Sequence, residues 1–507
     1  MLAKVLSFAL VGLEGKPIEA ETDIAKGLPA YLVVGLPDAA VKESKERIHA
    51  AIKNAGYLFP NNRLTVNLAP ADLKKEGSGL DLPIAICILK ASGQIPSKGF
   101  EDVVFFGELA LDGTLRPVRG VLPLLISARN LGYTRFMVPY ANRKEASYIS
   151  GIEVYAPQTL AEAVEFLRGE SQLSPVPHTE YAAGGTENPY SADLKYVKGQ
   201  LAARRAVEVA VSGGHNLLLV GPPGAGKTML AKCIPTIMPD MPFEEALEVT
   251  KIHSVAGQLD EDGIARRRPF RTPHHTATTV SLTGGGSNCR PGEISLAHGG
   301  VLFLDELPEY NRSTLEALRQ PLEDRVITVA RAANTVTYPA NFMLVASMNP
   351  CPCGNYGSRE NVCTCSASAI AKYRAKVSGP LLDRIDLQLV VDAVKYSELS
   401  SSAEGESSES VKRRVNAARE IQRKRFANDG IFTNSEMGEK HLKKYCVLSP
   451  ECEEVLKRAF IQLHLSARAR SRILKVARTI ADLAGEENIT RAHLLEAVGY
   501  RAVSDRD

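Results

Sequence analysis

A glycine-rich segment at residues 221–228 reads GPPGAGKT and fits the phosphate-loop pattern G-x-x-x-x-G-K-[ST]. It follows the apolar run NLLLV and precedes a helix-like stretch, TMLAK. In such a loop, backbone N–H groups wrap the phosphates, Lys227 reaches the β and γ phosphates and Thr228 ligates Mg²⁺. The pattern predicts binding of a nucleoside triphosphate, taken as ATP with Mg²⁺, by Gly221, Pro222, Pro223, Gly224, Ala225, Gly226, Lys227, Thr228 and Met229.

Two carboxylates, Asp305 and Glu306, follow a second apolar run, GVLFL. A carboxylate at the end of a buried strand beside a phosphate loop can hold Mg²⁺, and its neighbour can polarise the attacking water. We therefore expect Asp305 to bind the metal and Glu306 to activate water. The pair predicts hydrolysis as well as binding.

Two further polar elements come later in the chain. Asn349 follows the apolar run NFMLVASM, where its amide could orient the water, although it could equally be a turn residue before Pro350. Arg384 lies between two aspartates in SGPLLDRID. It could form a structural ion pair or reach the nucleotide of a neighbouring subunit.

Four cysteines, Cys351, Cys353, Cys363 and Cys365, lie within fifteen residues. Their number suits a tetrahedral Zn²⁺ site if the intervening loop folds back, although the C-x-C spacing is tighter than the usual C-x-x-C. Reduced free thiols and a redox disulfide remain alternatives. The adjacent His274 and His275 lack a matching carboxylate spacing, so we expect hydrogen-bonded loop residues there and no metal ligands.

The composition is that of an ordinary globular protein. Of 507 residues, 44% are hydrophobic and 23% charged, and no uncharged apolar run is long enough to span a bilayer. Nine cysteines are too few for a disulfide scaffold, which favours the reducing cytoplasm. The net charge is +3, but residues 411–507 carry 20 Lys plus Arg against 13 Asp plus Glu. This excess fits either a solvated helical surface or one that faces a polyanion.

Length and pattern predict a multidomain α/β protein. Mixed strand and helix patterns fill residues 1–172, and a segment rich in Pro, Gly and Ser at 173–193 is typical of a linker. Buried strands alternate with helices over 194–395, which predicts a largely parallel sheet covered on both faces. A polar linker at 396–410 then precedes helical spacing over 411–507.

The elements GPPGAGKT, VLFLDE, SMNP and GPLLDRIDL, in this order, resemble the AAA+ ATPase module, in the variant of the magnesium chelatase ATPase subunit and the MCM helicases. The stretches RTPHHTATTVSLTGGG, RPGEISLAHGGVLFLDELPEY and NPCPCG resemble the ComM/YifB family, over nearly the whole chain. The resemblance implies a three-layer α/β ATPase core and a C-terminal helical lid.

The N-terminal stretches RLTVNLAPADLKKEGSGLDLPIA and FGELALDGTLRPVRG resemble the C-terminal α+β domain of Lon protease. Where Lon-type proteases carry a catalytic lysine, this chain has residues 121–125, VLPLL. Ser78 therefore has no evident base, and we expect a scaffold without peptidase activity.

The resemblance also implies roles for single residues. Asn349 resembles sensor 1, Arg384 the finger that acts in trans, and Arg468 the sensor 2 arginine, with Arg470 and Arg472 as close alternatives. Residues 325–338 read as two strands with a short turn and correspond to the presensor hairpin, where Arg331 would contact DNA phosphates or would simply be solvated.

Membership of the family would imply a ring, expected to be a hexamer, that hydrolyses ATP on single-stranded or branched DNA. It would drive branch migration during natural transformation and homologous recombination. The alternative is a chelatase-like or chaperone-like ATPase that remodels a protein partner. A nucleotide-gated scaffold that binds DNA without moving along it is a third reading.

Overall fold

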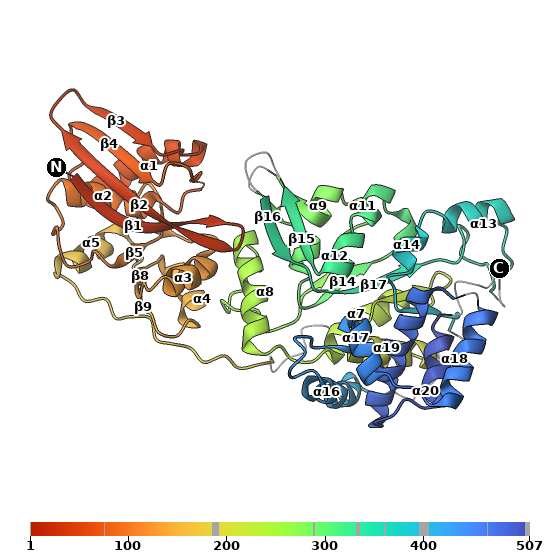
Figure 1. Ribbon diagram of the computed structural model, residues 1–507. Coiled ribbons are helices and arrows are strands. Elements are labelled where there is room, and N and C mark those ends of the chain that lie inside the picture. The colour runs from red at the N-terminus through yellow and green to blue at the C-terminus, as the bar shows by residue number, and fades with distance from the viewer. Residues whose placement is uncertain are drawn as a thin grey trace.

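The computed structural model describes residues 2–75, 77–184, 192–286, 289–330, 335–358, 361–394, 405–463 and 465–501. These residues form a mixed α/β, multidomain protein with two large sheets and a helical C-terminal region. In Figure 1 the N-terminal sheet lies to one side of the central sheet, and the C-terminal helices pack below the latter. The expected linkers at 173–193 and 396–410 lie partly outside the described residues.

The N-terminal sheet has seven strands in the order β3-β4-β2-β1-β5-β8-β9. Its alternating apolar residues face the helices, as in RLTVNLA, where Leu64, Val66 and Leu68 are buried. The strands are β1 (Leu2–Val11), β2 (Glu14–Ala25), β3 (Ala30–Val34), β4 (Arg63–Ala69), β5 (Val103–Phe105), β8 (Arg135–Met137) and β9 (Glu153–Tyr155). The helices are α1 (Ala39–Asn54), α2 (Asp81–Ala91), α3 (Val121–Asn130), α4 (Arg143–Ser147) and α5 (Leu160–Arg168).

The apolar run VVFFGELAL is not the continuous strand that its pattern predicts. It divides into β5 and β6 (Glu108–Leu109), and β6 pairs with β7 (Leu115–Arg116). At the break, the Gly107 amide donates to the Gly79 carbonyl, and the Gly107 carbonyl accepts from Leu82. A Cβ on Gly107 would lie 2.9 Å from that of Leu82, so the close approach of α2 ends the strand.

The central sheet has the order β11-β14-β17-β10-β18, and every pair in it is parallel, as predicted. Its strands are β10 (Leu217–Val220), β11 (Phe270–Arg271), β14 (Val301–Leu304), β17 (Met343–Met348) and β18 (Leu387–Val390). The helices around it are α6 (Leu201–Gly213), α7 (Lys227–Ile237), α8 (Phe243–Ala256), α9 (Thr279–Thr283), α10 (Glu293–Leu296), α11 (Arg312–Glu316), α12 (Arg319–Asp324), α13 (Ala367–Arg374) and α14 (Gly379–Leu382). Because the strands are parallel, their carboxyl ends share one edge, which is where ligands bind in such sheets.

Two short hairpins lie beside this sheet. One is β12 (Gly284–Gly285) with β13 (Arg290–Pro291), and the other is β15 (Val326–Ala330) with β16 (Thr335–Pro339), both antiparallel. The second contacts the turn between β1 and β2, because a Cβ on Gly12 would lie 2.5 Å from Cγ1 of Val336. The N-terminal sheet therefore packs directly on this hairpin.

A second contact joins the N-terminal part to α8. The Gly120 amide donates to the Ser254 carbonyl at 3.1 Å, and the Ser254 hydroxyl donates to Glu145 at 2.8 Å. Burial raises the pKa of Glu145, although hydrogen bonds from Asn142, Ser254 and Leu122 oppose the shift. Beside this contact is a cavity of about 910 Å³.

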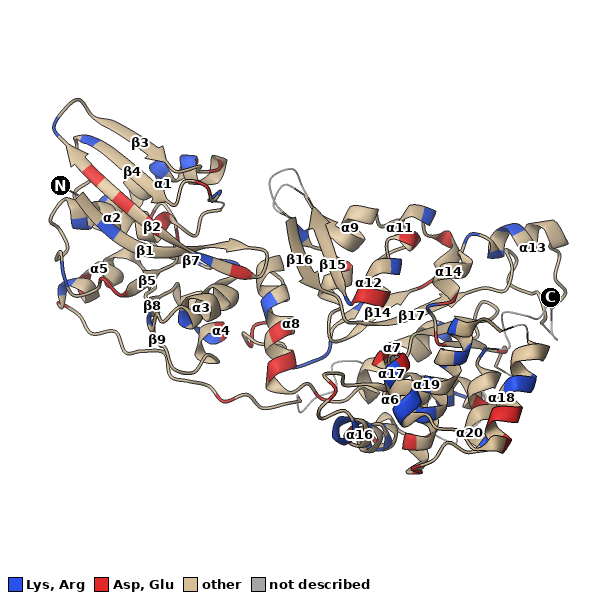
Figure 2. Ribbon diagram, viewed as in Figure 1, with Lys and Arg blue, Asp and Glu red and all other residues tan. Residues whose placement is uncertain are grey.

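The C-terminal region is helical, as predicted. Its helices are α16 (Ser408–Arg425), α17 (Glu439–Tyr445), α18 (Pro450–Gln462), α19 (Ala467–Ala484) and α20 (Arg491–Gly499). Helix α19 packs against α6, α16 and α20, so these helices share a core with the central sheet. Figure 2 shows many Lys and Arg residues on α16, yet Arg414 pairs with Glu208 and Glu406, and Arg423 pairs with Glu420. Much of the positive charge on α16 is thus neutralised within the chain.

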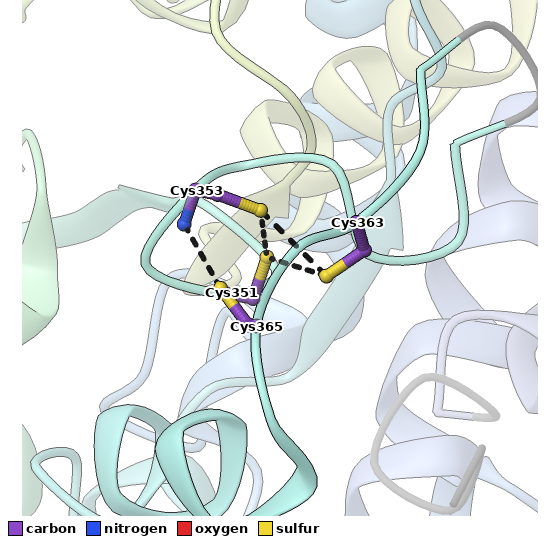
Figure 3. A group of neighbouring side chains, drawn as sticks. All are labelled: Cys351, Cys353, Cys363 and Cys365. Atoms are coloured by element: carbon purple, nitrogen blue, oxygen red, sulfur yellow. Dashed lines mark hydrogen bonds between the residues drawn. The ribbon is translucent and has the colours of Figure 1, made fainter.

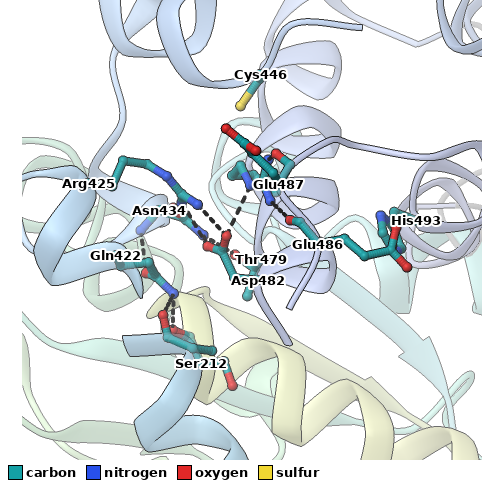
Figure 4. Close-up of polar contacts among 12 residues, drawn as sticks. Ser212, Gln422, Arg425, Asn434, Cys446, Thr479, Asp482, Glu486, Glu487 and His493 are labelled. Atoms are coloured by element: carbon teal, nitrogen blue, oxygen red, sulfur yellow. Dashed lines mark hydrogen bonds and ion pairs between the residues drawn. The ribbon is translucent and has the colours of Figure 1, made fainter. Parts of the chain in front are cut away.

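A buried polar network fixes α19 against α16 (Figure 4). Asp482, whose side chain is fully buried, pairs with Arg425 and Arg478 and accepts a hydrogen bond from Asn434 at 2.8 Å. A buried carboxylate is tolerated only when it is paired in this way. The network holds the C-terminal helices in one arrangement on the sheet.

Candidate nucleotide site

The phosphate loop connects β10 to α7 at the carboxyl edge of the central sheet. Gly224 and Gly226 adopt φ angles of +78° and +84°, in the left-handed region that favours glycine. A Cβ on Gly221 would lie 2.2 Å from the Val391 carbonyl oxygen, so only glycine fits beside β18. Helix α7 begins at Lys227, and its first N–H groups point toward the loop, as anion binding requires.

Lys227 crosses the loop and meets the strand that ends at Asn349. Its Nζ donates to the carbonyls of Gly221 at 2.6 Å and Pro222 at 2.9 Å, and to Asn349 Oδ1 at 3.2 Å. Burial lowers the pKa of Lys227, and the carboxylates of Asp305 and Glu306 partly oppose this. The structure thus brings together the lysine and the amide that the sequence separates by more than a hundred residues.

Asp305 follows β14 and is held from two sides. The Thr228 hydroxyl donates to Asp305 Oδ2 at 2.8 Å, and the Ser347 hydroxyl donates to Oδ1. Oxygen atoms of Thr228 and Asp305 are hard ligands of the kind Mg²⁺ prefers. Ser347 was missed by the sequence analysis, although a serine two residues before Asn349 in an otherwise buried apolar strand was a usable signal.

Glu306 has a left-handed backbone, φ +53°, which is uncommon for a residue with a side chain. Its side chain is 57% exposed, and His275 Nδ1 lies 3.5 Å from its Oε2. The ring of the neighbouring His274 lies 4.1 Å from that of His275, centroid to centroid and tilted by 33°, and His274 Nδ1 lies 2.9 Å from Thr276 Oγ1. Neither histidine belongs to the group of potential metal ligands found among the described residues.

Arg384 makes its contacts away from the phosphate loop. Its Nη2 lies 2.6 Å from Glu323 Oε2, and its Nη1 donates to the Pro380 carbonyl at 2.7 Å. The pKa of Glu323 is lowered, chiefly by its hydrogen bond with Arg384 and also by the charges of Arg468 and Arg472. Arg384 thus belongs to a cluster of arginines around one carboxylate.

The three candidate arginines of α19 differ in their surroundings. Arg468 is exposed in the first turn, and Arg470 lies 3.7 Å from Glu453. Arg472 pairs with the buried Asp386. Because Arg472 is held by a buried carboxylate, it is the least free of the three to reach a ligand. Arg331 lies outside the described residues, between β15 and β16.

The four cysteines converge between β17 and α13 (Figure 3). Their sulfur atoms all lie within 4.8 Å of one another, and Cys351 Sγ is 3.4 Å from Cys353 Sγ and 3.7 Å from Cys363 Sγ. A disulfide needs about 2.05 Å. Tetrahedral ligands at about 2.3 Å from a zinc ion place their sulfur atoms about 3.8 Å apart. The cluster therefore fits a structural metal.

In the N-terminal part, the Ser78 hydroxyl donates to the carboxylate of Glu108. The partner of the serine is thus an acid, and no lysine contacts it through the hydrogen bonds of the described residues. None of the helices in the described part of the chain combines the length and apolar character needed to cross a membrane.

Three family models match the chain in succession. They are "Subunit ChlI of Mg-chelatase" over residues 20–142, "Magnesium chelatase, subunit ChlI" over 193–399 and "Magnesium chelatase, subunit ChlI C-terminal" over 405–501. The N-terminal part is also similar to Lon protease 2 of Bacillus subtilis, with 28% identity over 141 residues that cover 26% of each chain.

Full-length relatives are similar from end to end. The uncharacterized protein YifB of Escherichia coli is 44% identical over 99% of this chain and 97% of its own length. The competence protein ComM of Haemophilus influenzae is 42% identical over 99% and 98%, respectively. Family membership implies ATP and Mg²⁺ as cofactors, in agreement with the cluster of Lys227, Thr228 and Asp305. The chain belongs to the ComM/YifB family of magnesium chelatase-like AAA+ ATPases.

Proposed function

We propose that this protein is a ring-forming, ATP-hydrolysing DNA motor that promotes branch migration during the uptake and recombination of DNA. The observation that carries the hydrolytic part is the convergence of Lys227, Thr228 and Asp305 with Asn349 at one edge of the central sheet. The similarity to a protein named for competence supports the cellular role.

In this proposal, residues 221–229 bind ATP, and Thr228 and Asp305 hold Mg²⁺. Glu306 polarises the attacking water, and Asn349 orients it against the γ phosphate. Bound Mg²⁺ would supply charge neutralisation at the phosphates. Arg384 and Arg468 complete the site, Arg384 from the neighbouring subunit, and the ring is a hexamer in the cytoplasm.

DNA contact is assigned to Arg331, between β15 and β16. A cation binds DNA phosphates without reading sequence, which suits movement along DNA. The N-terminal part, with an acid beside Ser78, serves as a scaffold that packs on the hairpin and on α8.

The metal held by the four cysteines is proposed to be Zn²⁺. Closed sets of four thiolates are typical of structural zinc. The distances between the sulfur atoms, 3.4 Å and 3.7 Å from Cys351 to Cys353 and Cys363, are close to those of such a site.

Glu306→Gln tests the hydrolytic proposal. The amide keeps the shape of the carboxylate but cannot polarise water, so kcat for ATP should fall at least about 100-fold while ATP still binds. Light scattering with ATP and DNA should give the molar mass of a hexamer for both proteins. Hydrolysis by the variant at the wild-type rate would remove Glu306 from this role.

A further inference from the structure

The four-cysteine loop and the nucleotide site share one segment of chain. Asn349, which accepts a hydrogen bond from Lys227, lies two residues before Cys351, the most buried of the four cysteines. Strand β17, which leads to both, is tied to the phosphate loop because the Gly221 amide donates to the Met348 carbonyl at 3.1 Å. A change in the position of the metal loop is therefore passed to Asn349 through a single intervening residue, Pro350.

The four-cysteine loop also packs closely against the phosphate loop. Gly354 has a φ of +82°, and a Cβ there would lie 2.5 Å from Cδ of Pro223. The backbone at Gly354 is held in turn by the metal loop, since its amide donates to the Cys351 carbonyl at 3.0 Å. The contact between Gly354 and Pro223 thus depends on the fold of the cysteine loop.

The chain that follows Cys365 leads back toward the region of Asn349. Cys365 is followed directly by Ser366, the N-cap of α13, whose side chain accepts from the Ala369 amide. Tyr373 of α13 lines the same cavity as Asn349. The loop therefore leads from Asn349 into a helix that lines the same cavity, and the four sulfur atoms close it.

Residues of the loop and proposed catalytic residues line one cavity of about 540 Å³. Its lining includes Glu306, Asn349, Pro352, Lys372 and Tyr373. Pro352 stands between the first two cysteines, so one wall of the cavity is part of the metal loop. The residue proposed to polarise water and the metal loop thus line the same cavity.

We propose that a Zn²⁺ ion bound by Cys351, Cys353, Cys363 and Cys365 holds the wall of the hydrolytic cavity, so that metal occupancy controls hydrolysis while leaving nucleotide binding in place. The inference rests on the proposed ATPase function. Without the ion, the two halves of the loop are joined by weak contacts between thiols and by the Cys353 amide, which donates to Cys365 Sγ at 3.4 Å, and Pro352 and Asn349 are held less firmly. The backbone N–H groups that would bind the phosphates belong to the loop glycines and the first turn of α7, whereas Pro223, which the metal loop contacts, has no N–H, so phosphate binding does not require the zinc ion.

The test compares Cys363→Ser and Cys365→Ser with Cys452→Ser, which removes a buried thiol of α18 far along the chain. Three quantities are measured for each: zinc per chain by elemental analysis, affinity for a non-hydrolysable ATP analogue, and kcat for ATP at saturation. Wild type and Cys452→Ser should hold one zinc per chain. The other two should lose zinc and at least about tenfold in kcat, with unchanged analogue affinity.

A second measurement avoids variants that fail to fold. Wild-type protein is stripped with a zinc chelator and assayed in excess Mg²⁺ before and after Zn²⁺ is restored. Hydrolysis should fall and then return with Zn²⁺. The inference would be overturned if wild-type protein purified without zinc, or if zinc-depleted protein kept the wild-type kcat. If zinc-loaded wild type binds the analogue yet never hydrolyses ATP, the proposed ATPase function itself fails.

Discussion

Arg384 forms an ion pair with Glu323, with 2.6 Å between Nη2 of the arginine and Oε2 of the glutamate. The arginine side chain is 8% exposed and the glutamate side chain 54%. Glu323 is in α12, which passes through Arg325 directly into β15. Arg325 in turn lies 2.8 Å from Glu436, next to the C-terminal helices. The base of the hairpin is therefore tied both to Arg384 and to the C-terminal region.

If Arg384 completes the site of a neighbouring subunit, two inactive variants should restore each other. Arg384→Ala keeps an intact phosphate loop, and Lys227→Ala keeps an intact arginine. When the two variants are mixed before assembly, roughly a quarter of the subunit interfaces in a ring should pair an intact phosphate loop with an intact Arg384. ATP hydrolysis by the mixture should then exceed that of either protein alone. Two variants that stay inactive when mixed would make Arg384 a structural residue of its own subunit.

Glu323→Gln should destabilise the protein, because it leaves the buried guanidinium of Arg384 without its counter-charge. We expect a loss of about 2 kcal/mol in the free energy of unfolding, less than for a fully buried pair because Glu323 is half exposed. Denaturant titration measures it. The neighbouring Asp324→Asn is the control and should cost well under half as much. Equal costs would mean that the ion pair contributes little.

His275→Ala should lower kcat about fivefold, because an interaction of about 1 kcal/mol that orients Glu306 is lost. The Michaelis constant for ATP should not change, since His275 does not contact the phosphate loop through the contacts of the described residues. His274→Ala, which removes the neighbouring ring that forms a hydrogen bond with Thr276, is the matched control. Steady-state kinetics distinguish the two. A kcat that is unaffected in His275→Ala would show that Glu306 is positioned without it.

Arg331→Ala should weaken DNA binding without changing ATP hydrolysis in the absence of DNA. Loss of one phosphate contact lowers the slope of log affinity against log salt by about one. Fluorescence anisotropy over a salt series measures it, with Asn334→Ala as the control, because this change removes no charge and lies three residues further along the chain. Identical salt slopes for Arg331→Ala and wild type would leave this arginine solvated.

The fold class and the helical C-terminal region could be predicted because each depends on local patterns. Buried runs such as LLLV and MLVASM need only hydrophobic periodicity and a βα alternation to predict a parallel sheet. The break in VVFFGELAL could not be predicted from local pattern, because it depends on α2, which approaches Gly107 from another part of the chain.

The same distinction applies to the site. The phosphate loop is continuous in sequence, so its pattern suffices to locate it. Three contacts of the site could not be predicted, because each joins segments that are distant in the sequence. They are Ser347–Asp305, His275–Glu306 and Glu323–Arg384. The four cysteines are intermediate, because their spacing suggested a cluster and only the return of the loop brings the sulfur atoms together.

The central claim, an ATP-driven motor on branched DNA, is tested most directly with a labelled four-way junction. Wild-type protein with ATP and Mg²⁺ should convert the junction into two duplexes, and DNA should stimulate hydrolysis. Glu306→Gln, or wild type with a non-hydrolysable analogue, should bind the junction and leave it intact. If wild type hydrolyses ATP at a rate that DNA does not change and leaves every junction intact, the account is contradicted, and a protein partner becomes the substrate to seek.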